Sequence, residues 1–201
     1  MKKKLLSALM LCSLGLVVGC GDDDGNTPPP TDNTPKLDSQ ANILAFLDGK
    51  TVVMEGANIP SHPNGFSENL DLGPNSQCYS KVTILGGGQG VTVDSDLGTI
   101  QNGACNREAK RDGQPFATTS VAIQNVAADG SCFDVDFNFN GFAQQGRGSF
   151  SADRKTLKLE LFFSGQATGN RCANGAVGAP NTVTLNKAPF TGNAVQTYVI
   201  P

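Results

Sequence analysis

Residues 132–139 read CFDVDFNF, the most regular alternation in the chain. Large apolar side chains alternate in this stretch with polar ones, which is typical of a strand that is buried on one face only. Asn140 and Gly141 follow and predict a tight hairpin turn into a second strand over 142–151. The sequence therefore predicts an antiparallel sheet with one apolar face.

Working outward from this hairpin, the chain predicts a series of short strands separated by turns rich in Gly, Asn or Pro. Two long connections break the series, an irregular loop over 56–74 and a polar loop over 106–114. The predicted strands cover 50–55, 77–85, 91–94, 98–104, 117–126, 132–139, 142–151, 156–163 and 182–185. The sequence thus indicates an all-β domain of about eight or nine strands.

One short helix is predicted before the first strand, over 38–48. Ile43, Leu44 and Leu47 fall on one helical face, and Asp38 or Ser39 can cap the N-terminus. Gly49 follows as the expected C-terminal cap.

A run of short antiparallel strands has to close or stack to cover its edges and its apolar face. An up-and-down β-barrel of about eight strands is the simplest closure, and a two-sheet β-sandwich is the alternative. The short capped helix and the junction 47–53, LDGKTVV, resemble the start of lipocalin-like β-barrels. That resemblance also implies a barrel, although the tryptophan usual at this position is absent, since the chain has none.

The N-terminal segment predicts export. Three lysines, an apolar run over 5–18 and a small residue at Gly19 have the build of a signal peptide over 1–19. The apolar run is shorter than the ~20 residues that a membrane-spanning helix needs. Val17-Val18-Gly19-Cys20 resembles the lipobox of bacterial lipoprotein precursors. The resemblance implies cleavage before Cys20, lipidation of its thiol, and anchoring to a membrane by several acyl chains such as palmitate.

The residues after Cys20 predict a flexible tether over 20–36, because this segment is polar and rich in proline and aspartate. Gly21 is not the aspartate that retains lipoproteins in the inner membrane of enteric bacteria. We therefore expect a Gram-negative cell-envelope protein, on the outer membrane rather than the inner one. The remaining residues, 37–201, predict one domain with its own core.

Charge argues against nucleic acid as a partner. The whole chain has a net charge of −3, and the signal peptide carries three lysines and no acid, so the mature protein is more acidic still. The expected partners are the membrane, through the lipid, and either another envelope protein or a small apolar ligand.

Four cysteines in the mature domain predict two disulfides, because the compartment permits oxidation. Cys78 begins one predicted strand and Cys105 ends the return path of its hairpin, so both should lie at one end of the sheet. Cys132 and Cys172 are separated by an even number of strand passes and should also meet. This favours pairing 78 with 105 and 132 with 172 over the two alternatives.

No motif in the chain makes a complete metal or phosphate site, and no cofactor is expected. Residues 136–141 imitate the first half of a calcium loop, but the twelfth position is Arg147 instead of glutamate. The cysteines lack zinc spacing, and His62 is the only histidine. The glycine-rich 86–90 lacks the lysine and the helix of a phosphate-binding loop.

Catalytic motifs are incomplete as well. His62 has no nucleophile elbow to serve. Carboxylates two residues apart, such as Asp94 with Asp96 or Asp134 with Asp136, are common on solvated strands. The sequence therefore predicts that the protein is not an enzyme, and glycan-active chemistry is the weakest hypothesis.

Two binding hypotheses remain. The first is an interaction or structural scaffold that contacts another envelope protein through the loop 56–74 and the charged run 106–112. The alternative is a lipocalin-like module for a small apolar ligand, lined by the aromatic residues of the central strands. Those residues are Phe133, Phe137, Phe139, Phe142, Phe150 and Phe162. The scaffold is slightly favoured.

Overall fold

The computed structural model describes residues 34–61, 78–88, 90–102, 104–112, 116–118, 120–139 and 142–201, which belong to one compact unit. The lipobox with Cys20, most of the tether, most of the loop 56–74 and His62 lie outside the described residues. The elements are α1 (Gln40–Leu47), β1 (Thr51–Glu55), η1 (Gly56–Asn58), β2 (Tyr79–Gly87), β3 (Gly90–Gln101), β4 (Ala104–Asp112), β5 (Phe116–Ala117), β6 (Ser120–Gln124), β7 (Phe133–Phe139), β8 (Phe142–Phe150), β9 (Thr156–Phe163), β10 (Ala167–Thr168), η2 (Cys172–Asn174), β11 (Thr184–Leu185), β12 (Ala188–Pro189) and β13 (Val195–Val199).

Helix α1 confirms the predicted helix. The Oγ of Ser39 caps it by accepting a hydrogen bond of 3.3 Å from the backbone N–H of Asn42. Ile43 and Leu47, one turn apart, are its buried residues, and Gly49 follows at a φ of +69°, which glycine adopts without strain. No helix in the described ranges is long and apolar enough to cross a membrane.

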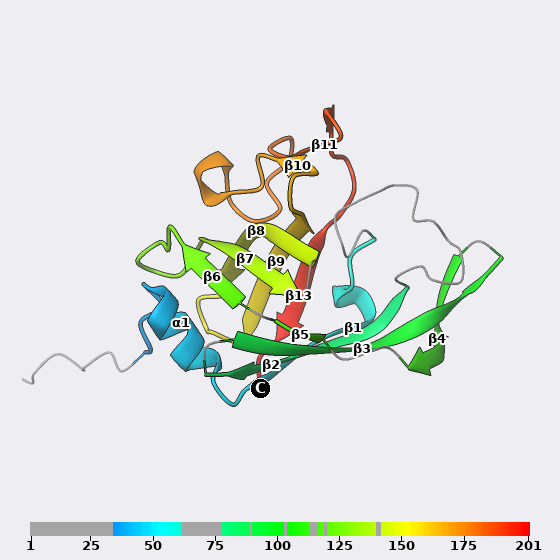
Figure 1. Cartoon of the computed structure of the whole chain (residues 1–201), viewed down its shortest axis with the longest axis horizontal. Helices are drawn as coiled ribbons and strands as arrows, with labels where there is room; N and C mark the ends of the chain where they lie inside the picture. Colours follow the sequence, from blue (N-terminus) through cyan, green and yellow to red (C-terminus); the bar gives the residue numbers. More distant parts are fainter. Residues whose placement is uncertain are drawn as a thin grey trace, which may run out of the picture. The chain divides into compact units, whose positions relative to one another are not determined.

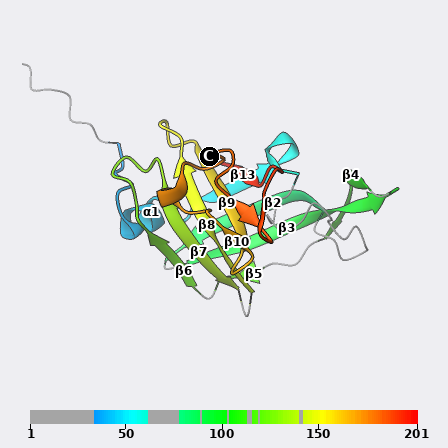
Figure 2. The same ribbon diagram turned by 90° about the horizontal axis from the view of Figure 1, so that it is seen from above.

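Within the described ranges, the large sheet runs in the order β4-β3-β2-β1-β13-β9-β8-β7-β6, and β5 adds to β3. All its pairs are antiparallel. It curls into a half barrel, with β2 and β3 passing beneath β6–β9 (Figure 1) and α1 at one end (Figure 2). At the centre of the order, β1 and β13 are registered at one residue pair, Val53 with Val199.

The predicted closed barrel is wrong, because the sheet ends in two edges, β4 and β6. Near α1 the edges approach each other: the backbone N–H of Thr118, between β5 and β6, donates to the carbonyl of Val91 in β3 (3.1 Å). Farther along, β3 pairs instead with β4, from Asp96 to Gln101. Charged side chains on β4 discourage any further strand from pairing there. The continuous ladder also differs from the two-sheet sandwich.

Strand β4 corrects a second prediction, since the polar loop expected over 106–114 is strand as far as Asp112. The strands expected over 91–94 and 98–104 are one strand, β3, with a register shift between Leu97 and Thr99. Gly98 lies at this shift, and a Cβ there would come within 2.7 Å of the Asn106 carbonyl oxygen and 2.8 Å of the Cys78 Sγ. Glycine therefore permits β4 to cross close to the disulfide.

Strand β13 was not predicted, yet it lies in the middle of the sheet between β1 and β9. Along this strand the side chains with polar groups face inward, and an apolar side chain faces outward. Gln196 and Tyr198 are buried, whereas Val199 is half exposed. A search for apolar residues on the inward face misses such a strand.

The sheet buries residues on both faces. The concave face holds the main core, which includes Val52, Val82, Phe133, Leu159 and the helix residue Ile43. On the convex face, a small second core forms under the segment 164–194. Its buried members are Phe162, Ala167, Val183 and Ala194.

Both predicted disulfides are confirmed, Cys78–Cys105 with a Cα–Cα distance of 5.5 Å and Cys132–Cys172 with 5.9 Å. The predicted route to Cys172 was wrong, however. Three strands, β7 to β9, lead away from Cys132, and the chain then returns across the convex face. On this return path, the Asn170 side chain donates to the Gln145 carbonyl and the Cys172 N–H donates to the Asp134 carboxylate.

Candidate functional site

The concave side of the half barrel contains an apolar cavity of about 210 Å³. Both limbs of the curled sheet contribute to its wall, which explains why its residues are far apart in the sequence. The lining residues are Met54, Tyr79, Val82, Ile84, Val93, Phe137, Phe139, Gln144, Leu159, Leu161, Phe163, Gln196 and Tyr198. Under α1, by contrast, packing leaves a space of only about 30 Å³. The interior is therefore filled at the helix end and hollow toward the other end.

The cavity has a buried floor and a more accessible rim. Met54 of β1 and Tyr198 of β13 are 1% and 2% exposed, and Gln196 is buried beside them. The rim includes Phe139 and Phe163, which are partly exposed. An apolar molecule in this space would exchange water for contact with both aliphatic and aromatic side chains, which is favourable in proportion to the area buried.

A neutral hydrogen-bonded pair lies at the floor. The Tyr198 hydroxyl donates to the Gln196 side-chain oxygen at 2.7 Å, and both groups are buried. Burial raises the pKa of Tyr79, on the opposite limb, from 10.0 to about 12. The pKa of Tyr198 is also raised, mainly by burial and to a smaller extent by its electrostatic interaction with Tyr79. Both phenols therefore remain uncharged at neutral pH.

Of the six phenylalanines predicted to line a ligand site, the cavity includes Phe137 and Phe139. Phe133 and Phe150 pack against each other in the filled end, with ring centroids 5.6 Å apart. Phe162 lies in the convex core against Phe190, at 5.4 Å. The Phe142 side chain lies outside the described part of the chain. The prediction that Phe133, Phe150 and Phe162 would line the same site is therefore corrected.

The sequence reasoning missed the polar lining residues, Tyr79, Gln144, Gln196 and Tyr198. Gln196 and Tyr198 belong to the strand that was not predicted. Tyr79 follows Cys78 directly, and the register shift between Tyr79 and Lys81 interrupts the alternation of β2. The sequence did contain one indication of these residues. Both tyrosines of the chain stand among β-branched residues, which favour strands, and the hydroxyl of a buried tyrosine usually has a hydrogen-bond partner.

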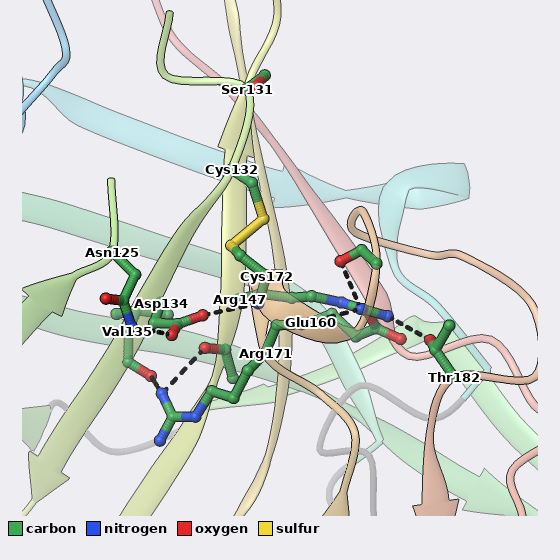
Figure 3. The surroundings of a disulfide bond; sticks show 12 residues. Asn125, Ser131, Cys132, Asp134, Val135, Arg147, Glu160, Arg171, Cys172 and Thr182 are labelled. Atoms are coloured by element: carbon green, nitrogen blue, oxygen red, sulfur yellow. Dashed lines mark hydrogen bonds and ion pairs between the residues drawn. A yellow bond between two sulfur atoms is a disulfide. The ribbon is translucent and has the colours of Figure 1, made fainter. Parts of the chain in front are cut away.

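The convex face carries a different kind of buried group, an ion pair. Arg147 is 0% exposed, and its Nε donates to the Glu160 carboxylate at 2.7 Å. Its two Nη atoms donate to the Gly175 carbonyl (2.7 Å) and the Thr182 hydroxyl (2.9 Å) (Figure 3). The Gly178 N–H also donates to Glu160. The pair thus holds the overlying segment 164–194 against β8 and β9.

Asp134 and Asp136, predicted as the nearest carboxylate pair of the central strand, both contact the covering segment. Asp134 accepts from the Asn125 side chain and from the Cys172 N–H, each at 2.8 Å. Asp136 forms an ion pair with Arg171 at 2.7 Å. The two carboxylates therefore hold adjacent residues of the covering segment, Cys172 and Arg171. Among the described residues, no group of three or more His, Cys, Asp or Glu side chains is arranged to hold a metal ion.

The charged run 106–112 lies on β4 and is partly engaged within the sheet. The Arg107 Nε donates to the Tyr79 carbonyl (3.0 Å), and the Arg111 Nε donates to the Gly98 carbonyl (3.1 Å). The side-chain oxygen of Asn106 accepts hydrogen bonds from the backbone N–H groups of Glu108 and Ala109. In these contacts, side chains of β4 form hydrogen bonds with backbone groups at this end of the sheet.

Comparisons with protein-family models, curated proteins and solved structures found no significant match to this chain.

Proposed function

We propose that this protein is a lipid-anchored component of a bacterial cell envelope that binds a small, mainly apolar ligand in the concave cavity of its half barrel. The sequence alone slightly favours a scaffold over a ligand-binding module. The cavity of about 210 Å³, with nine apolar residues among its thirteen lining residues, shifts this preference. Ligand sites in proteins are typically concave and mostly apolar, with a few polar groups that orient the ligand.

The size of the cavity limits the ligand. An apolar cavity of ~150 Å³ in another protein holds benzene. The present cavity therefore suits a molecule with one or two rings, or a short branched chain, more than a long lipid. Catalysis is not part of the proposal.

A cavity-filling substitution tests the proposed binding. Val93 is a partly exposed lining residue on β3, so Val93→Phe should occupy the cavity with little strain. Val199→Phe is the matched control, because Val199 is 50% exposed and does not line the cavity. We expect Val93→Phe to weaken binding of the fluorescent apolar probe naphthalene at least tenfold, with the control within twofold of wild type.

Native mass spectrometry of the folded domain complements this test. Extra mass that disappears on denaturation identifies a ligand acquired during expression. Equal binding of naphthalene by the wild type and Val93→Phe would contradict the proposed site, and failure of the wild type to bind would contradict the proposed function.

The proposed anchor rests on the lipobox at 17–20. Cys20→Ser should abolish incorporation of labelled palmitate and release the protein from the membrane fraction, because lipidation needs the thiol. Cys12→Ser is the matched control, since Cys12 lies within the predicted signal peptide. Unchanged labelling of the Cys20→Ser variant would contradict the anchor. Separation of inner from outer membranes tests the proposed outer-membrane location.

The scaffold hypothesis retains one candidate surface, the β3–β4 hairpin, which extends beyond the body of the sheet (Figure 1). The Cys78–Cys105 disulfide ties the hairpin near its turn, because Cys105 pairs with Ile100. Glu108, Lys110 and Asp112 are exposed charged residues on β4. Crosslinking in cells from these three positions tests for an envelope partner, and the ligand hypothesis predicts no specific crosslink there.

A further inference from the structure

We infer that the cavity selects uncharged ligands that carry a hydrogen-bond donor, and that the Tyr198 hydroxyl oxygen at the floor accepts that donor. This inference rests on the proposed function and specifies its ligand class. Three observations carry it: the charge of the lining, the geometry of the floor, and the size of the space.

The lining is electrically neutral. None of the thirteen lining residues is an acid, a lysine, an arginine or a histidine. An anion that enters loses its hydration and gains no ion pair in return, which is costly in an apolar site. A neutral molecule of the same shape avoids this cost.

The floor pair is oriented. Tyr198 is 2% exposed and Gln196 is 6% exposed, and the hydroxyl proton of Tyr198 is committed to the Gln196 oxygen at 2.7 Å. A phenol hydroxyl has one proton and two acceptor lone pairs. Once the proton is committed, the oxygen can only accept. A ligand that reaches the floor therefore gains a hydrogen bond if it brings an O–H or N–H group.

The surrounding side chains restrict the shape of the ligand. Met54 and Leu159 flank the floor and are almost fully buried, and Phe137 stacks on Phe139 toward the rim with centroids 5.9 Å apart. This arrangement suits a flat ring whose polar group points down. Phenols, indoles and aromatic amides belong to this class.

Three naphthalene derivatives of almost the same shape test the inference. Naphthalene has no polar group, 2-naphthol is a neutral donor at neutral pH, and 2-naphthoate is an anion. We expect 2-naphthol to bind the wild type about three- to tenfold more tightly than naphthalene, which corresponds to one net hydrogen bond. We expect 2-naphthoate to bind at least tenfold more weakly than 2-naphthol.

Two matched variants locate the acceptor. Tyr198→Phe should remove the three- to tenfold preference for 2-naphthol over naphthalene. Tyr79→Phe, the same change at the other tyrosine of the cavity, should keep the preference. If Tyr198→Phe does not fold, the three ligands with the wild type still test the ligand class, and loss of the preference in Tyr79→Phe still overturns the assignment of the acceptor.

The outcomes separate the inference from the proposed function. If naphthalene binds and 2-naphthoate binds as tightly as 2-naphthol or more tightly, the inference is overturned. The apolar cavity would then remain the ligand site. Loss of the preference in Tyr79→Phe instead of Tyr198→Phe would overturn the assignment of the acceptor. Absence of binding by all three compounds would overturn both.

Discussion

The two faces of strands β7–β9 are both buried, but by opposite means. On the convex face, Arg147 and Glu160 form a closed polar network with the segment 164–194. On the concave face, Leu159 and Phe137 meet apolar side chains and border a hollow space. Hydrogen bonds to a buried charge require fixed partners, whereas apolar contact is not directional. The difference assigns the directional contacts that maintain the fold to the convex face and leaves the unfilled space on the concave face.

The largest effect is expected from breaking the convex ion pair. Arg147→Met leaves the Glu160 carboxylate buried without its cation, and we expect a loss of about 3 to 5 kcal/mol in the free energy of unfolding. Urea denaturation followed by circular dichroism measures it. The matched control is Arg147→Met combined with Glu160→Leu, which removes both charges and should recover part of the loss. A single variant as stable as the wild type would show that the network contributes nothing.

The next effect concerns the two disulfides, of which only Cys132–Cys172 reaches the segment that covers the convex face. Replacing both cysteines of either pair by alanine should cost about 2 to 4 kcal/mol, because the bridges close loops of 27 and 40 residues. Only loss of Cys132–Cys172 should expose the segment 164–194 to limited proteolysis. Equal proteolysis of both double variants would mean that this disulfide does not hold the covering segment.

The concave face makes a smaller, pH-dependent contribution. The pKa of Tyr79 is raised in the folded protein from 10.0 to about 12, so the folded state binds more protons than the unfolded state between these values. Its stabilising contribution is therefore complete below pH 10 and is lost as the pH rises toward 12. Absorbance titration of the folded protein should show no phenolate step near pH 10, and Tyr79→Phe should weaken the alkaline loss of stability. A full-amplitude step near pH 10 would contradict the buried setting.

The smallest effect is expected at Ser80, whose buried Oγ has no hydrogen-bond partner. Ser80→Ala removes an unsatisfied polar group and should raise the free energy of unfolding by about 0.5 to 1 kcal/mol. Ser151→Ala is the matched control, because the Ser151 Oγ bonds to Asp153 and to the Thr156 N–H. This variant should instead lose about 1 kcal/mol. Thermal denaturation that ranks the two variants the other way would refute the assignment.

The sequence predicted the features that depend on local patterns. The hairpin around 132–151 follows from strict alternation and an Asn-Gly turn, and α1 follows from its Ser39 cap. The cysteine pairing was also predicted, although the path to Cys172 is not the expected one. For the hairpin and the helix, neighbouring residues carry enough information to specify the element.

The remaining features depend on contacts distant in the sequence. Strand β13 is central, but Gln196 on its inward face disguises it. The convex core depends on Arg147 reaching Gly175 and Thr182, which no local pattern encodes. The cavity exists because the sheet curls without closing. The alternation of apolar and polar residues along a strand is the same in a closed barrel and in an open sheet, so it does not distinguish them. Sequence reasoning therefore assigned only two of the thirteen lining residues, Phe137 and Phe139, to the site.

The single registered pair between Val53 of β1 and Val199 of β13 has a mechanical consequence. It joins two limbs whose internal ladders are longer, such as the five pairs between β1 and β2. Met54 and Tyr198, at the floor of the cavity, stand on the two strands of this narrow joint. A sheet bends most readily where the fewest backbone hydrogen bonds resist. The half barrel thus has its smallest number of registered strand pairs directly beneath its cavity.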